Sequence, residues 1–308
     1  MAITNNFDKG KLGTAYVPNT YEELGNSIGK VAFQIIREVT AINPLATFSK
    51  IPVNNGDTIE QDIIKLVEAQ GYDPTGAGAL SRDNTEKMAV RLFNNWERHK
   101  YKTTVDISKI RKILTDGKGS EEVAQRLVAV LSESDTNDHF QALKALLTWG
   151  RTESATSAND QALVNLGSVA KSGTSIDYKG ILKKIKDTIK GMQFVNTSFN
   201  KAGIKRRTMA EDIRIIMPYT IKNAIDVDEL SGVFNLSKAE IESKIIETDT
   251  DEHYIYIVDQ NAILDFTRLY EMVSQLNADG LFFNYFLHVE RLFAISELFD
   301  GCFFEYKV

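Results

Sequence analysis

Cysteine is almost absent from this sequence. Cys302 is the only one among 308 residues, so no disulfide can form within the chain, and a reducing compartment is favoured. No histidine or second cysteine lies near it in the sequence. We therefore interpret Cys302 as a small buried apolar side chain rather than a reactive thiol.

Long apolar stretches are missing as well. No segment approaches the run of about 18 apolar residues that a membrane-spanning helix needs. The first residues, MAITNNFDKGKLGTAYVPN, lack the apolar core of a signal peptide, and Asp8 interrupts them. We expect a soluble, cytosolic chain without a leader.

Sequence motifs typical of catalytic, nucleotide-binding or metal-binding sites are also missing. The four histidines lie in separate segments without metal-ligand spacing. GAG at 76–78 is followed by Ser81 where a dinucleotide fingerprint needs a third glycine, and DGKGS at 116–120 lacks the order of a phosphate loop. The acidic run ETDTDEH at 247–253 lacks the glycine and final glutamate of a calcium loop. The sequence therefore predicts no enzyme, no cofactor and no metal site.

Charge gives a further exclusion. The net charge of −6 argues against a free nucleic-acid binder, whose affinity comes from clustered lysine and arginine. One local cluster, KAGIKRR at 201–207, is interpreted as a solvated loop or a contact to an acidic neighbour, ahead of a phosphate site. A predicted amphipathic helix at 178–192 carries lysines that are typical of a solvated face and less often of a partner surface: Lys183, Lys184, Lys186 and Lys190.

The most informative region spans residues 57–106. Its first limb, GDTIEQDIIKLVEAQGYD, has a net charge of −4, and the limb KMAVRLFNNWERHKYK at 87–102 has +4. Between them lies the turn-rich stretch DPTGAGALSRDN. Two limbs of opposite charge predict a long hairpin with complementary cross-strand pairs. The apolar residues between Ile59 and Val67 fit a helix at least as well, so periodicity alone favours the other structure.

Elsewhere the sequence alternates predicted helices and strands. Helical spacing predicts helices at 21–39, 107–115, 120–134 and 135–149, with Ser120 as an N-cap. A stretch rich in small residues at 150–175 forms a boundary. From residue 209 the pattern becomes α/β, with strands at 211–219 and 253–260 and helices at 220–235 and 237–247.

The C-terminus is rich in aromatic residues. Residues 281–308 hold nine of the 29 aromatic residues of the chain, although chain ends usually fray into solvent. The segment is therefore predicted to belong to the core, with Phe286 and Phe293 buried against the helices at 120–149. Asp300-Gly301 is a hairpin turn signal within it.

The order of these parts resembles a major capsid protein of the fold shared by tailed double-stranded DNA bacteriophages and bacterial encapsulin shells. The resemblance rests on FSKIPVNNGDTIEQDIIKLVEAQGYD, RLFNNWERHKYKTTVDISKIRKI and FQALKALLTW, then on IRIIMPYTIKNAIDVDELSGVFN, IYIVDQNAILDF and FFNYFLHVERLFAISELF. It implies an α+β fold and an icosahedral shell subunit without catalysis. An encapsulin that encloses cargo enzymes is the alternative, and an α/β nucleotide-binding enzyme is a remote one.

The resemblance also implies an order of domains. It comprises an N-terminal arm at 1–20, a helix and lead-in at 21–56, an extended loop at 57–106, a peripheral domain with a spine helix at 107–208, an axial domain at 209–280 and closing strands of the peripheral domain at 281–308. The extended loop would overlap a neighbouring subunit. This role makes a strand the expected structure at 59–67, against the helical periodicity.

Partners follow from the same resemblance. The chain would form hexamers and pentamers of a closed shell in a virion assembled in the host cytoplasm, with no membrane. A portal, a separate scaffolding protein if one is used, and double-stranded DNA held by confinement would complete the assembly. Within the extended loop the candidate intersubunit contacts are charged: Asp62, Lys65, Arg82, Lys87, Arg91 and Arg98.

Overall fold

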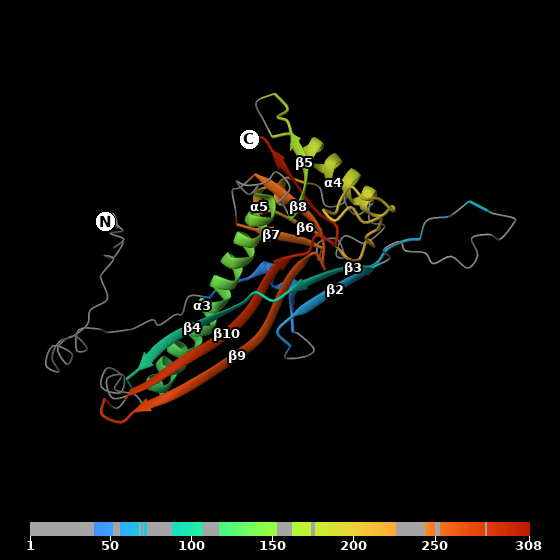
Figure 1. Cartoon of the computed structure of the whole chain (residues 1–308). Coiled ribbons are helices and arrows are strands. Elements are labelled where there is room, and N and C mark those ends of the chain that lie inside the picture. The colour runs from blue at the N-terminus through green and yellow to red at the C-terminus, as the bar shows by residue number, and fades with distance from the viewer. Residues whose placement is uncertain are drawn as a thin grey trace, which may run out of the picture. The chain divides into compact units, whose positions relative to one another are not determined.

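The computed structural model describes most of the chain after residue 39 (Figure 1). The described residues are 40–51, 56–67, 69, 71–72, 88–106, 117–152, 162–173, 176–225, 244–249, 253–280 and 282–308. They fall into two compact units: the smaller holds those of 102–130 and 274–285, and the larger holds the remainder. The predictions for the arm at 1–20 and the helices at 21–39 and 107–115 lie outside the described residues.

Three sheets and three α-helices form the described part. The four-stranded sheet has the order β1 (Ser49–Lys50), β9 (Ile263–Asn277), β10 (Phe282–Ile295) and β4 (Trp96–Val105). The five-stranded sheet has the order β5 (Val164–Val169), β11 (Gly301–Tyr306), β8 (Tyr254–Asp259), β6 (Ile213–Pro218) and β7 (Ile245–Thr248). The strands β2 (Ile59–Ile64) and β3 (Met88–Phe93) pair alone. The helices are α3 (Gly117–Arg151), α4 (Tyr178–Met192) and α5 (Tyr219–Ala224), preceded by the 3₁₀ turn η1 (Pro44–Phe48). This mixed architecture confirms the predicted α+β fold class.

The five-stranded sheet forms because its inner strands are apolar on both faces. IRIIMP of β6 and YIYIVD of β8 are almost continuously buried, as expected of strands covered on both sides. The helix α4 covers one side with the stripe Ile181, Ile185 and Ile189, and all three side chains are fully buried. It begins at Asp177, whose side chain accepts from the Gly180 N–H at 3.0 Å. The bounds predicted for this helix, 178–192, are confirmed.

The second core cluster joins η1 to α3 and to β8. Phe48 and Leu45 of η1 pack with Phe140, Leu143 and Leu147 of α3 and with side chains of the five-stranded sheet. The helix α3 is continuous from Gly117, so the prediction of two separate helices was wrong, and Ser120 lies inside the helix instead of capping it.

Tertiary partners explain why the polar stretch at 135–138 does not break α3. Asp135 is buried and forms a forked ion pair with Arg291 of β10, with oxygen to nitrogen distances of 2.5 and 2.8 Å. The Thr136 hydroxyl donates to the Ser132 carbonyl at 2.9 Å within the helix. Residues that favour turns in isolation are therefore satisfied without one.

Two further predictions, for residues in the C-terminal half of the chain, were wrong. Residues 245–247, predicted as the end of the helix at 237–247, belong to β7 (Ile245–Thr248), because this segment pairs in parallel with β6 in the buried sheet. Asp300-Gly301 is no hairpin turn, because β10 and β11 belong to different sheets. A Cβ on Gly301 would stand 2.7 Å from Leu163 Cδ2, so the glycine permits close packing.

The predicted helix at 220–235 is described only to residue 225, where α5 has ended.

The aromatic C-terminus enters the core mainly through β11. Phe303, Phe304 and Tyr306 are buried, and so is Cys302, whose predicted burial is confirmed. Burial is also the main cause that raises the pKa of the Cys302 thiol. Phe293, predicted to be buried, is half-buried; it packs against the cluster that contains α3, with its ring centroid 5.7 Å from that of His139.

The predicted burial of Phe286 was wrong. Its side chain is half-buried and has the Lys100 ammonium 5.8 Å from its ring centroid. Side chains alternate along a strand, so Phe286 faces away from the side on which its neighbours Leu287 and Val289 are buried.

We expect that removing residues 281–308 abolishes cooperative folding. The truncation takes β10 from between β9 and β4 and β11 from between β5 and β8, which leaves unpaired strands in both larger sheets. Thermal unfolding followed by circular dichroism measures this outcome. A soluble truncated chain with a sharp transition near that of the full chain would contradict it.

We also expect Phe304→Ala to destabilise the chain by about 3–5 kcal/mol, the usual cost of truncating a buried phenylalanine. Phe304 is fully buried between α4 and the sheet. Phe286→Ala is the matched control, because it removes the same atoms from a half-buried site, and a clearly smaller loss is expected. Urea unfolding of both variants tests the difference, and equal losses would argue against the observed core.

Candidate functional site

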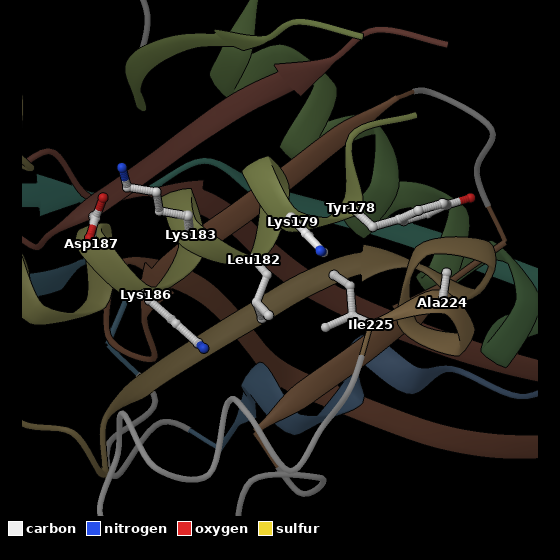
Figure 2. Close-up of a pocket in the computed structure, with 8 residues that line it drawn as sticks. All are labelled: Tyr178, Lys179, Leu182, Lys183, Lys186, Asp187, Ala224 and Ile225. Atoms are coloured by element: carbon white, nitrogen blue, oxygen red, sulfur yellow. The ribbon is translucent and has the colours of Figure 1, made fainter. Parts of the chain in front are cut away.

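No three His, Cys, Asp or Glu side chains within the described part of the chain are placed to hold a metal ion. No described helix combines the length and hydrophobicity needed to cross a membrane. The pocket drawn in Figure 2 has a volume of about 540 Å³ and lies between α4 and α5. Lysines and apolar side chains line it, among them Lys179, Leu182 and Ile225.

One buried polar cluster lies at the loop after α4. Asp259 accepts from Arg206 at 2.8 Å, and Asp300 accepts from Thr208 at 2.7 Å and from Asn200 at 3.1 Å. Burial raises the pKa of Asp259, although the Asn261 N–H and the Arg206 guanidinium act in the opposite direction. These bonds hold the loop after α4 against the ends of β8 and β11, because each carboxylate would be costly to bury without partners.

The remaining candidate is the two-stranded ribbon formed by β2 and β3. Its register pairs Asp62 with Val90 and Gln61 with Arg91. A strand is therefore observed at 59–64, as the resemblance implied and against the helical periodicity. A two-stranded ribbon is marginally stable alone because it has little surface to bury.

One face of the ribbon is exposed and largely apolar. We call it the outer face; it consists of Glu60, Asp62 and Ile64 from β2 and of Met88, Val90 and Leu92 from β3. Ile64 and Leu92 are 79% and 64% exposed. On the other face, Ile59, Ile63 and Phe93 are half-buried. Four large apolar side chains, Ile64, Met88, Val90 and Leu92, are therefore exposed on this narrow ribbon, a pattern typical of an interaction surface.

The predicted charge complementarity between the limbs was wrong within β2 and β3. Glu60 stands opposite Leu92, and Asp62 stands opposite Val90, so neither acid faces a base. Alternation of side chains is the reason: the acids share the outer face with apolar residues, whereas Arg91 projects from the other face. Arg91 pairs with Glu297, which follows β10 by two residues.

The predicted contact residues do not form one cluster. Asp62 is exposed on the outer face, Lys65 is half-buried just after β2, and Arg98 is exposed on β4. Arg91 is engaged within the chain. Arg82 and Lys87 lie outside the described residues.

An arginine that the sequence did not single out anchors the root of the ribbon. Arg268 of β9 donates to Asp57 at 2.6 Å and to Glu290 at 2.7 Å, and its guanidinium lies 4.6 Å from the Trp96 ring centroid. The Trp96 indole N–H donates to the Asp57 carbonyl at 2.7 Å. The hydrogen bonds to Glu290 and then Asp57 raise the pKa of Arg268. Asp57 lies just before β2, where the ribbon begins, and Trp96 lies just after β3, where the ribbon ends. The Arg268 guanidinium contacts both residues and therefore joins both ends of the ribbon to β9 of the four-stranded sheet.

A second anchor lies at the turn between β8 and β9. Gln61 donates to the Asn261 carbonyl at 3.1 Å, and Lys50 donates to the Asn261 side chain at 2.9 Å. Burial lowers the pKa of Lys50, whereas the charge of Asp259 acts to raise it. Gln61 and Asn261 are 200 residues apart, so no local sequence signal marks this contact.

The amino-acid sequence is similar to those of phage major capsid proteins. A family model described as Phi29-like phage major capsid protein matches residues 5–305. The major capsid protein of Bacillus phage GA-1 is 25% identical over 297 residues, covering 94% of this chain and 61% of that protein. That of Streptococcus phage Cp-1 is 22% identical over 300 residues, covering 91% of this chain and 80% of that protein.

The chain spans about three fifths of the length of some relatives: 61% for GA-1 and 60% for Bacillus phage PZA. Among solved structures, the capsid of Staphylococcus phage Andhra aligns with a TM-score of 0.73 at 12% identity, covering 90% of this chain and 87% of that one. The capsid of cyanophage P-SCSP1u aligns with a TM-score of 0.58 at 10% identity, covering 90% and 91%. At these identities the structures establish the tailed-phage capsid fold.

We expect Arg268→Gln to loosen the root of the ribbon without unfolding the chain. The change removes the charge that joins Asp57 to Glu290. Amide hydrogen exchange should become several-fold faster at 59–64 and 88–93 and stay unchanged in the five-stranded sheet. Arg98→Gln is the matched control, since Arg98 is exposed on the neighbouring strand β4. Unchanged exchange in the ribbon of Arg268→Gln would refute the anchoring role.

Proposed function

This chain belongs to the Phi29-like phage major capsid protein family, and on that premise we propose that it is the structural subunit of a bacteriophage head. Copies of it assemble as hexamers and pentamers into a closed icosahedral shell that encloses the double-stranded DNA genome. The match of the family model over residues 5–305 is the observation that carries this proposal. The tailed-phage capsid fold supports it independently of sequence identity.

The alternatives receive no such support. The phage capsid matches favour neither an encapsulin that encloses cargo enzymes nor an α/β nucleotide-binding enzyme. The family is one of structural capsid proteins, and we extend this to the proposal that the chain has no catalytic function. The buried acids Asp259 and Asp300 agree with this role, since their hydrogen bonds tie segments of the fold together.

The outer face of the ribbon is the contact that we assign to a neighbouring subunit. A ribbon whose root is fixed by Arg268 and Gln61 keeps its direction, and its exposed residues Ile64, Val90 and Leu92 gain little within their own chain. Burying them against a second copy would release about 25 cal/mol for each Å² of apolar surface. Asp62 lies within this face, opposite Val90, and Arg98 of β4 would lie outside it.

The remaining assignments are parts of the same proposal. The extended loop at 57–106 overlaps a neighbour, the residues at 107–208 form the peripheral domain, and those at 209–280 form the axial domain near a capsomer's centre. The arm at 1–20 and the closing strands at 281–308 complete the subunit. A portal and a separate scaffolding protein are the proposed protein partners, and DNA is held by confinement.

We expect the double variant Val90→Asp with Leu92→Asp to fold but not to form closed shells. Two carboxylates on the outer face would be desolvated in the subunit contact without partners. The control Val90→Ile with Leu92→Met keeps the face apolar at similar volume and should assemble. Thermal unfolding reports folding, and negative-stain microscopy with sedimentation reports shells. Normal shells from the Asp variant would overturn the role of the outer face.

A further inference from the structure

Charge is distributed unevenly along this chain. Residues 177–210, which comprise the cap of α4, the helix and the loop after it, carry nine lysines and arginines and two aspartates. This segment has a net charge of +7, and the rest of a chain whose total is −6 therefore has −13. A basic segment in an otherwise acidic protein indicates a polyanionic partner.

The lysines of α4 form a straight stripe. Lys179, Lys183, Lys186 and Lys190 follow one another at intervals of four, three and four residues. At about 100° and 1.5 Å per residue, they lie within about 60° of arc and along about 16 Å of helix. Figure 2 shows the side chains of Lys179, Lys183 and Lys186 extending from α4. We call these four residues the lysine stripe.

The stripe lies on the side of α4 that the core leaves uncovered. Ile181, Ile185 and Ile189 are fully buried against the sheet, whereas Lys179, Lys183 and Lys190 are exposed. Among the described residues, none of these three lysines has a carboxylate partner within ion-pair distance. Lys190 has only a long contact of 3.5 Å to the Gln193 side chain. Their charges are therefore available to a ligand.

Other cations of the segment are occupied within the fold. Lys184 donates to the Leu166 carbonyl at 2.6 Å and lies 5.8 Å from the Phe304 ring centroid. Arg206 is held by Asp259 at 2.8 Å. The segment thus contains two kinds of cation: Lys184 and Arg206, which are held within the fold, and Lys179, Lys183 and Lys190, which are exposed.

The composition of the stripe favours phosphate groups over a protein surface. Contacts between proteins are enriched in Trp, Tyr and Arg and depleted in Lys. Lysine is a hydrated point charge on a flexible stem and suits contacts that require neither fixed geometry nor base recognition. At about 3.4 Å per nucleotide along one strand, the stripe extends over about five phosphates.

We infer that the lysine stripe is the surface on which the enclosed duplex DNA lies, with the ammonium groups of Lys179, Lys183 and Lys190 contacting backbone phosphates without reading the bases. This inference rests on the proposed function and adds a specific contact surface to confinement. Binding by a few lysines is weak for each subunit, because sequence-independent contacts of this kind have dissociation constants of roughly 10⁻⁴–10⁻⁶ M. Repetition over a shell would order the outermost DNA and still let it leave.

The first experiment measures DNA binding by unassembled subunits. The triple variant Lys179→Gln, Lys183→Gln and Lys190→Gln is compared with the control Lys100→Gln, Lys171→Gln and Lys307→Gln, which removes the same charge from exposed positions outside the stripe. Fluorescence anisotropy with a short mixed-sequence duplex is recorded over a series of salt concentrations. The slope of log K against log salt should become shallower by about 2.7 in the stripe variant, about 0.9 for each lost contact, and change far less in the control.

The second experiment locates the stripe in particles. Lysines are acetylated in DNA-filled and in emptied shells, and the products are quantified by mass spectrometry. We expect DNA to protect Lys179, Lys183 and Lys190 and to leave Lys171 and Lys307 unaffected. Equal acetylation in both kinds of particle would overturn the inference.

The outcomes separate this inference from the proposed function. If the stripe variant forms normal shells and binds DNA as the unmodified chain does, the inference fails and the proposed function stands. If its shells do not form while subunit DNA binding is unchanged, the stripe is a protein contact and the inference fails. If the unmodified chain forms no shells under any condition, the proposed function fails, whereas loss of DNA binding by the stripe variant still supports a phosphate surface.

Discussion

The structure depends on the placement of the last 28 residues inside both larger sheets. β10 runs between β9 and β4, and β11 runs between β5 and β8. An inner strand provides hydrogen bonds on both of its edges, so neither sheet is complete until the end of the chain has docked. The pairings of β11 with β5 and of β10 with β4 join strands far apart in the sequence and therefore close long loops. The aromatic composition of residues 281–308 suits strands in this position, because many of their side chains are buried.

The buried polar groups complement this arrangement by fixing where the last strands lie. Arg291 of β10 meets Asp135 of α3, and His139 of α3 lies 2.8 Å from Asp265 of β9. Asp300, just before β11, is fully buried and held by Thr208 and Asn200. Each of these pairs would be costly to break, since a buried charge would remain without a partner. The pairs therefore select one register among the many that an apolar segment alone would tolerate.

The ribbon and the lysine stripe are the two surfaces that we propose for contacts with other molecules. Arg268 and Gln61 fix the root of the ribbon, while its outer face carries the apolar surface. The helix α4 is fixed by three fully buried isoleucines, while Lys179, Lys183 and Lys190 stand in solvent. In both cases the residues that hold the element are distinct from those offered to a partner. A shell that repeats such contacts by symmetry needs only modest strength from each one.

The sequence by itself determined the local features of this protein. The spacing of apolar residues set the bounds of α4, continuous apolar runs marked β6 and β8, and aromatic content placed the C-terminus in the core, because each depends on short-range composition. Only the tertiary structure decided the rest. It made one helix of α3 by pairing Asp135 with Arg291, 156 residues away, and it turned Phe286 outward through strand alternation. It made a strand of 59–64 against helical periodicity, and it paired Arg91 with Glu297 instead of the acidic limb. These outcomes rest on partners far apart along the chain, and the local pattern around each residue carries no information about which distant group will reach it.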